Sequence, residues 1–167
     1  MKILASLFVW LELTGLGIWV GGMLTLGALV APTVFNTVKP VEMAGEAMSL
    51  VFRRFNGGLV YVCIFLVMVG FLGKGWLGSS RGLRRWIEGA LVTGMVLTGL
   101  YIGAILGPRM QELRQIRLAD PSNGSAVAEF DRGHRTSETL FSVNLLLGLA
   151  ALWMNSRPSI DTNRKEA

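Results

Sequence analysis

Four long stretches without charged residues alternate with charged connections along the chain. They run from Leu13 to Val38, from Phe55 to Gly73, from Gly89 to Pro108 and from Thr139 to Ser156. Each is close to the roughly 20 apolar residues that a helix needs to cross about 30 Å of hydrocarbon. A strand in lipid would leave backbone groups unpaired, so the stretches predict helices. The expected fold class is all-α.

These stretches predict one transmembrane domain over residues 1–156, a polytopic membrane four-helix bundle. We expect spans at about residues 10–35, 56–77, 86–107 and 137–155, followed by a polar tail over residues 157–167. The first apolar run is longer than the roughly 7–15 residues of a signal-peptide core. We therefore expect it to be a retained helix.

An amphipathic segment separates the first two predicted spans. After Pro40, apolar residues recur at helical spacing: Val41, Ala44, Met48, Val51, Phe52 and Phe55. The other side of that helix carries Glu42, Glu46, Ser49 and Arg53. This pattern predicts an amphipathic helix between helices one and two, either in the membrane interface or leading into helix two.

Composition agrees with a lipid environment. Hydrophobic residues make up 51% of the chain and charged residues 16%, against about 25% charged in an ordinary soluble domain. The mean hydropathy is +0.50. The formal charge of +5 lies in the connections, where lipid head groups and topology explain it. We expect membrane lipid as a partner and no nucleic acid.

Topology follows from the basic residues in the connections. The N-terminus, the connection over residues 74–85 and the tail share one membrane side. That connection is short and holds four basic residues and no acid. Short basic loops favour the cytoplasmic side. We expect a multi-pass protein of the plasma (inner) membrane with both termini in the cytoplasm.

Glu12 and Glu88 are the acids nearest the apolar runs. A carboxylate inside a membrane is a candidate functional group, because isolated charge in lipid is unfavourable. Glu12 is therefore a candidate for a proton or cation pathway. The structural alternative places both acids at head-group depth, where Glu88 pairs with Arg84 or Arg85 at a helix entrance.

A second candidate is a polar stripe on the fourth helix. His134, Ser137 and Asn144 fall on one helical face. Such groups commonly form hydrogen bonds between helices and fix packing. The alternative is a small polar site, with Arg109, Asp131 and Glu138 as neighbours.

Glycine and proline mark expected structural positions. Gly17 and Gly21, and likewise Gly99, Gly103 and Gly107, repeat at the four-residue spacing that allows close helix crossings. Pro32 and Pro108 are expected to end or kink helices one and three.

The sequence predicts neither a catalytic constellation nor a metal site. His134 is the single histidine and Cys63 the single cysteine. Bis-histidine haem, multi-histidine metal sites and an intrachain disulfide are therefore excluded. We expect no cofactor, with His134 as a single axial ligand of haem or metal left as an alternative.

Three groups of residues resemble a known family. They are the run Gly17 to Gly22 continuing to Ala31–Phe35, with Ala44-Gly45 and Phe52–Phe55 after it; Pro108-Arg109-Met110; and Phe130, His134, Ser137 and Asn144. Together they resemble the transmembrane protein 205-like domain family of unknown function. The resemblance implies small four-helix membrane proteins without an agreed activity. It singles out Pro32, Phe35, Pro108, His134, Ser137 and Asn144.

The leading functional hypothesis is a non-enzymatic structural or accessory membrane component. Its expected partners are lipid, a second copy of the chain or another membrane protein. One alternative is a small transporter or permeation unit that uses Glu12 or the stripe of His134, Ser137 and Asn144. A second alternative is a haem- or metal-binding membrane subunit.

Overall fold

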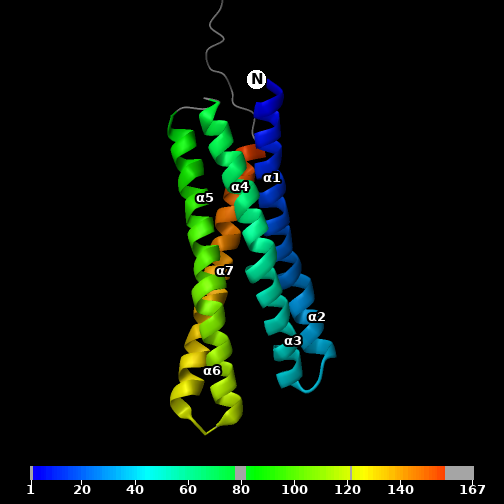
Figure 1. Ribbon diagram of the computed structural model, residues 1–167. Helices are drawn as coiled ribbons and strands as arrows, with labels where there is room; N and C mark the ends of the chain where they lie inside the picture. Colours follow the sequence, from blue (N-terminus) through cyan, green and yellow to red (C-terminus); the bar gives the residue numbers. More distant parts are fainter. Residues whose placement is uncertain (1, 78–81, 121, 157–167) are drawn as a thin grey trace, which may run out of the picture.

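The structure is a computed structural model that describes residues 2–77, 82–120 and 122–156 (Figure 1). These residues are helical apart from short turns. The α-helices are α1 (Lys2–Thr25), α2 (Ala31–Thr37), α3 (Val41–Arg54), α4 (Val60–Trp76), α5 (Leu83–Tyr101), α6 (Gly107–Ala119) and α7 (Gly124–Ser156). Three π-helical turns join some of them: η1 (Leu26–Val30), η2 (Phe55–Leu59) and η3 (Ile102–Leu106).

The π turns make longer continuous helices out of these segments. Four helices result, and each is long and apolar enough to cross a membrane: Ile3–Thr37, Val41–Trp76, Leu83–Ala119 and Gly124–Ser156. This confirms the expected all-α membrane bundle. The helices are longer than the expected spans, mainly at the end formed by α2, α3 and α6.

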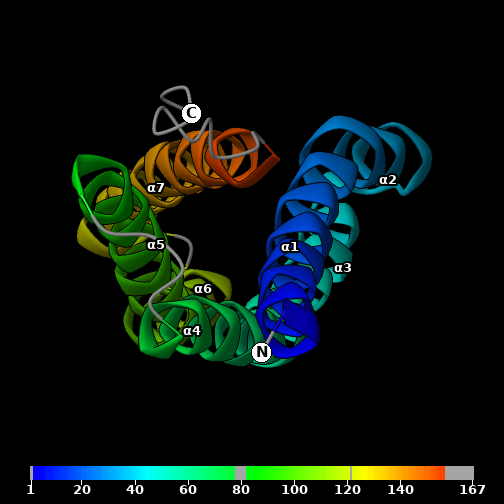
Figure 2. The same ribbon diagram turned by 90° about the horizontal axis from the view of Figure 1, so that it is seen from above.

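The four long helices are arranged in the order α1, α4, α5, α7 when the bundle is seen from above (Figure 2). α1 packs most extensively on α4, α5 packs on α7, and α7 also contacts α1. The N-terminus, the end of α4, the start of α5 and the end of α7 lie at one end of the bundle (Figure 1). We call this the N-terminal end, and the opposite one the α3–α6 end.

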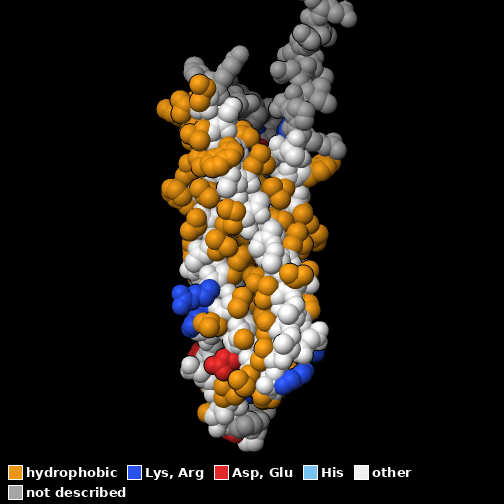
Figure 3. Space-filling model, turned by 90° about the vertical axis from the view of Figure 1, so that its right-hand side faces the viewer, with side chains coloured by type: hydrophobic (Ala, Val, Ile, Leu, Met, Phe, Trp, Pro, Cys, Tyr) orange, Lys and Arg blue, Asp and Glu red, His pale blue; other side chains and the backbone are white. Residues whose placement is uncertain are grey.

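Large apolar side chains fill the interior and also cover much of the exterior. Leu16, Trp19 and Met23 of α1 are buried against residues of α4, α5 and α7. On the outside, Phe65 of α4 is 65% exposed and Trp10 of α1 is 61% exposed. Figure 3 shows hydrophobic side chains over most of one face, with charged ones gathered toward the α3–α6 end. An exterior of this kind is suited to lipid.

Pro32 and Pro108 do not end their helices, which was one of the two effects expected of them. Each lies in the first turn of an α-helix that directly follows a π turn. Proline has no N–H and crowds the carbonyl four residues before it. The wider π turn accommodates this change, and the helices continue to Thr37 and Ala119.

The expected amphipathic helix is α3. Its apolar side buries Ala44 and Met48. It continues through η2 into α4, so it is the first part of the second long helix, as the alternative of a segment leading into helix two anticipated.

The turn between α6 and α7 is built by side-chain caps. Asp120 Oδ1 accepts hydrogen bonds from the backbone N–H and the hydroxyl of Ser122. Asn123 Oδ1 accepts the backbone N–H of Ala126 at 3.1 Å, which caps the start of α7. The expected polar tail, residues 157–167, lies outside the described residues.

Candidate functional site

A buried charged cluster lies inside the N-terminal end of the bundle. Its centre is Lys74, near the end of α4, which is only 6% exposed. The Lys74 Nζ atom lies 2.7 Å from Glu12 Oε2 of α1. It also forms an ion pair and a hydrogen bond with Glu88 Oε1 of α5. One ammonium group therefore faces two carboxylates in a largely apolar interior.

Asn155 of α7 completes the cluster. Its Oδ1 atom accepts a hydrogen bond of 2.8 Å from Lys74 Nζ. Its Nδ2 atom donates to Glu12 Oε1 at 3.0 Å. The cluster thus takes one residue from each of the four long helices. We call Glu12, Lys74, Glu88 and Asn155 the four-helix clasp.

The helix topology explains why these residues meet. Glu12 lies near the start of the first long helix, Lys74 near the end of the second, Glu88 near the start of the third and Asn155 near the end of the fourth. Antiparallel neighbours bring alternating starts and ends to the same end of a bundle. The clasp is therefore assembled at one membrane depth.

Glycine in α4 makes the approach of Glu12 feasible. A Cβ atom at Gly70 would lie 2.6 Å from Glu12 Cβ and 2.6 Å from the Phe8 carbonyl oxygen. Cβ atoms do not approach other atoms this closely. The backbones of α1 and α4 can therefore touch at this point, as small residues permit in membrane helices.

Two arginines surround the clasp and bind backbone carbonyls. Arg84 donates to the Met154 carbonyl at 2.6 Å, and Arg85 donates to the Phe71 carbonyl at 2.6 Å. The Arg85 guanidinium also lies 4.1 Å from the centre of the Phe71 ring. Glu88 was expected to pair with Arg84 or Arg85 at a helix entrance, but its ion pair is with Lys74, which belongs to the same connection.

The clasp is suited to holding helices together. Glu12 is fully buried, and Glu88 is 6% exposed. Removing one partner from such a buried ion pair leaves an uncompensated charge and is strongly destabilising. Polar groups between membrane helices commonly fix their packing. The same carboxylates are also buried groups that could exchange a proton.

The residues of the second sequence candidate do not form one site. His134 is exposed, and its Nε2 lies 3.2 Å from Glu138 Oε1 on the same helix. Ser137 is half-buried. Asn144 is buried and donates a hydrogen bond of 2.9 Å to the Met95 carbonyl of α5. Asn144 therefore joins two helices, whereas His134 faces outward.

Arg109 has its own partners at the α3–α6 end. Its guanidinium lies 2.7 Å from Glu129 Oε1 of α7 and 2.8 Å from Glu112 Oε2 of α6. It does not meet Glu12, which lies at the opposite end of the bundle. Of the residues expected beside His134, Glu138 does contact it. Arg109 instead pairs with Glu112 and Glu129.

The expected packing glycines fall into two groups. A Cβ at Gly99 would lie 2.6 Å from Trp19, and one at Gly103 would lie 3.1 Å from the Asn56 carbonyl oxygen. These glycines do allow close crossings. Gly17 and Gly21 have no neighbour within 4 Å of such an atom, because they face outward; Gly15 supports the packing of α1 instead, against α4. Phe35 is also exposed on the exterior.

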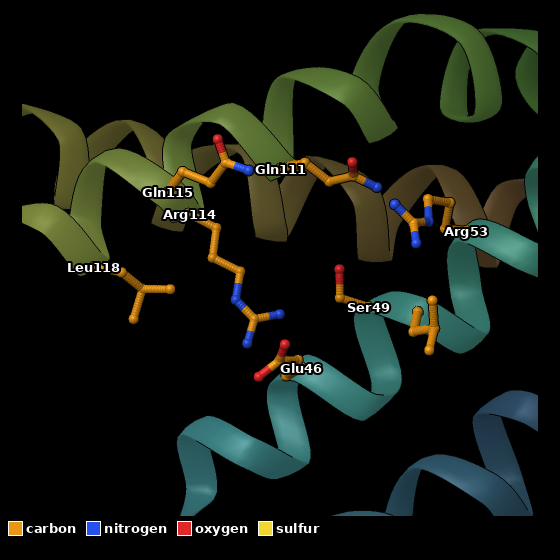
Figure 4. Close-up of a pocket in the computed structure, with 8 residues that line it drawn as sticks. Glu46, Ser49, Arg53, Gln111, Arg114, Gln115 and Leu118 are labelled. Atoms are coloured by element: carbon orange, nitrogen blue, oxygen red, sulfur yellow. The ribbon is translucent and has the colours of Figure 1, made fainter.

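A polar cleft lies between α3 and α6 at the other end of the bundle (Figure 4). The cleft is open to the outside and has a volume of about 250 Å³. Its lining residues are Glu46, Ser49, Leu50, Arg53, Gln111, Arg114, Gln115 and Leu118. Arg114 spans the two helices, donating to the Gly45 carbonyl at 3.0 Å and the Glu42 carbonyl at 3.2 Å.

Sequence reasoning missed Lys74 and Asn155 as members of a buried site. Lys74 follows an apolar run, where a lysine at head-group depth is the ordinary interpretation. Asn155 ends the fourth run. Their position could have indicated the site. Both residues lie at the membrane side on which the sequence places Glu12 and Glu88.

The described residues contain no group of three or more His, Cys, Asp and Glu side chains placed to hold a metal ion. Lys74 occupies the space between the two buried acids of the clasp. A cation between these carboxylates would have to displace its ammonium group.

Comparison with known proteins identifies a family but no characterised relative. No curated protein and no solved structure matches the chain significantly. The profile of a family described as a domain of unknown function (DUF4149) matches residues 14–119. The matched region includes Lys74 and Glu88 of the clasp and all lining residues of the cleft between α3 and α6. This multi-pass membrane protein therefore belongs to the DUF4149 family.

Proposed function

We propose that the protein is a non-enzymatic accessory component of the membrane, a rigid bundle that binds another membrane protein or a second copy of itself. The observation that carries this proposal is the four-helix clasp, in which Lys74 binds Glu12, Glu88 and Asn155 and so joins side chains of all four long helices inside the bundle. A site of this kind favours a fixed arrangement of helices over an opening.

The outward glycines of α1 support binding of a partner helix. Gly17 and Gly21 are exposed, and nothing in the described chain lies within 4 Å of a Cβ built on either. Two glycines at four-residue spacing let another helix approach closely within a membrane. Their position outside the bundle makes them available to a partner.

The test introduces bulk on this outer face and follows association. In the double variant Gly17→Leu/Gly21→Leu we expect the fold to remain intact, because the new side chains meet no residue of the chain. We expect loss of the complex that the wild type forms, measured by crosslinking in native membranes and by native mass spectrometry.

The matched control is Phe65→Ala, a change at an exposed position on α4. It should leave the complex intact. A wild-type protein that stays monomeric and uncrosslinked in its native membrane would refute the accessory role. If the double variant associates as well as the wild type, the partner does not bind at the outer face of α1.

We also propose that the protein resides in the plasma (inner) membrane with both termini in the cytoplasm, within a single transmembrane domain. The basic residues Lys74, Arg84 and Arg85 at the N-terminal end support this orientation. The resemblance to transmembrane protein 205-like proteins supports the same general class.

A second candidate function is a small transporter or permeation unit. The observation that favours it is the pair of buried carboxylates, Glu12 and Glu88, on either side of Lys74. Intramembrane acids of this kind mark proton relays in pumps and transporters. The test is a proteoliposome flux assay of Glu12→Gln, with His134→Ala for the outward-facing histidine; a flux that survives the first change excludes a path through the clasp.

A further inference from the structure

The helix lengths place the cleft between α3 and α6 at the level of the lipid head groups. The rise from Lys74 to Arg53 along the second long helix is about 31 Å at roughly 1.5 Å per residue. The hydrocarbon core of a bilayer is about 30 Å thick. We take the clasp to lie near one boundary of the core, and Arg53 then lies near the other.

The cleft presents two opposite charges in a defined order. Arg53 lies on the side nearer the spanning part of the helix, and Glu46 lies two helical turns further out (Figure 4). Neither side chain has an ion-pair or hydrogen-bond partner among residues 2–77, 82–120 and 122–156. The Arg114 side chain extends toward Glu46 (Figure 4) but forms no ion pair with it among the described residues, so both charges can still bind a ligand.

The remaining lining provides hydrogen bonds and an apolar margin. Ser49 lies between the two charged residues, the Gln111 side chain of α6 points toward Arg53, and Gln115 lies farther along α6 (Figure 4). Leu50, which is 48% exposed, adds apolar surface beside Arg53. Arg114 is engaged with α3 carbonyls and holds the two sides of the cleft together.

We propose that this cleft binds the head group of a phospholipid that carries a primary ammonium group. Arg53 binds the phosphate, with Ser49 and Gln111 as further hydrogen-bond donors, because guanidinium groups pair well with phosphate oxygens. Glu46 binds the ammonium group. In such a lipid the phosphate is nearer to the acyl chains and the ammonium is outermost, which is the order of Arg53 and Glu46 along α3.

This site goes beyond the proposed accessory function, since it lies on other helices than Gly17 and Gly21. Loss of lipid binding would leave the association of α1 untouched, and loss of association would leave the lipid site untouched. The experiments can therefore refute either proposal without refuting the other.

The experiment measures retained lipid by native mass spectrometry of the full chain in nanodiscs. The nanodiscs contain equal parts of phosphatidylethanolamine, phosphatidylglycerol and phosphatidylcholine. We expect one phosphatidylethanolamine to be retained preferentially. Arg53→Gln should lower its retention roughly tenfold or more, given the typical strength of a charged hydrogen bond.

Two neighbouring residues provide matched controls. Arg54→Gln removes the same charge one residue further along and outside the cleft lining, and should leave retention unchanged. Glu46→Gln should abolish the preference for phosphatidylethanolamine over phosphatidylglycerol, whereas Glu42→Gln should preserve it.

Three results would overturn the proposal. Equal losses in Arg53→Gln and Arg54→Gln would indicate diffuse attraction to the membrane surface. Equal retention of all three lipids by the wild type would show that the head group is not recognised. Complete displacement by millimolar phosphoethanolamine alone would assign the cleft to a soluble ligand.

Discussion

At the scale of single residues, Lys74 has the largest expected effect on stability. It is the cation that faces both Glu12 and Glu88. Lys74→Met leaves two carboxylates together inside the bundle, and breaking a buried pair in this way is expected to lower stability by about 3–5 kcal/mol. The measurement is unfolding in detergent mixtures followed by circular dichroism.

The control for this change is Lys39→Met, since Lys39 is exposed and, among the described residues, donates only to the Phe35 carbonyl. It should have little effect. The triple variant Glu12→Gln/Lys74→Met/Glu88→Gln removes all three charges and should recover most of the loss. If Lys74→Met unfolds no more easily than Lys39→Met, the clasp is not a stabilising element.

A second residue-scale prediction concerns Gly70. In Gly70→Ala the new methyl group overlaps Glu12 and the Phe8 carbonyl, and overpacking of this kind typically lowers stability by about 1–3 kcal/mol. Gly17→Ala meets no atom within 4 Å and should be neutral or stabilising, because alanine favours helix. If both variants have the same stability toward unfolding in detergent, the close contact between α1 and α4 at Gly70 does not contribute to stability.

The residue scale is also where sequence reasoning succeeded least. Glu12 was a candidate because an acid beside an apolar run is unusual. Its partners, Lys74 and Asn155, were not predicted from the sequence. Lysine and asparagine near the ends of spans are ordinary at head-group depth, so Lys74 and Asn155 carry little signal individually. Their inward orientation depends on the rotation of each helix, which packing decides and a single sequence does not.

At the scale of elements, Arg114 of α6 joins its helix to α3. Its guanidinium donates to two carbonyls of α3. Arg114→Gln shortens the side chain and removes its charge, so we expect faster amide hydrogen exchange in α3, the element it fastens. The control is Arg132→Gln on α7, because Arg132 donates to the Ala128 carbonyl of its own helix. Unchanged exchange in α3 would show that contacts other than those of Arg114 hold α3 against α6.

Element boundaries were predictable from hydropathy only where the helix lies in lipid. The four apolar runs gave four helices, and the period of apolar residues after Pro40 gave α3. The sequence left open whether Pro32 and Pro108 end or kink their helices, because proline can do either, and the structure shows that the helices continue. The two π turns that precede these prolines share a local pattern, an aliphatic residue, Gly-Ala and two more aliphatic residues followed by a small residue and proline (residues 26–32 and 102–108), which the sequence interpretation did not use.

At the scale of the whole molecule, the orientation in the membrane is testable with single cysteines. In a Cys63→Ala background, Leu83→Cys reports on the N-terminal end and Ser122→Cys on the α3–α6 end; both positions are exposed. With the termini in the cytoplasm, a membrane-impermeant maleimide should label Ser122→Cys in intact cells. It should label Leu83→Cys only after permeabilisation, and the reverse pattern would invert the topology.

The length of the second helix has a consequence for membrane thickness. It has 36 residues, or about 54 Å of rise, while Lys74 of the clasp and Arg53 are separated by about one hydrocarbon thickness. A bundle locked at one end cannot shorten its apolar band when the bilayer thins, so it must tilt or deform the surrounding lipid. The protein should therefore concentrate in those regions of a heterogeneous membrane whose acyl chains match this fixed spacing.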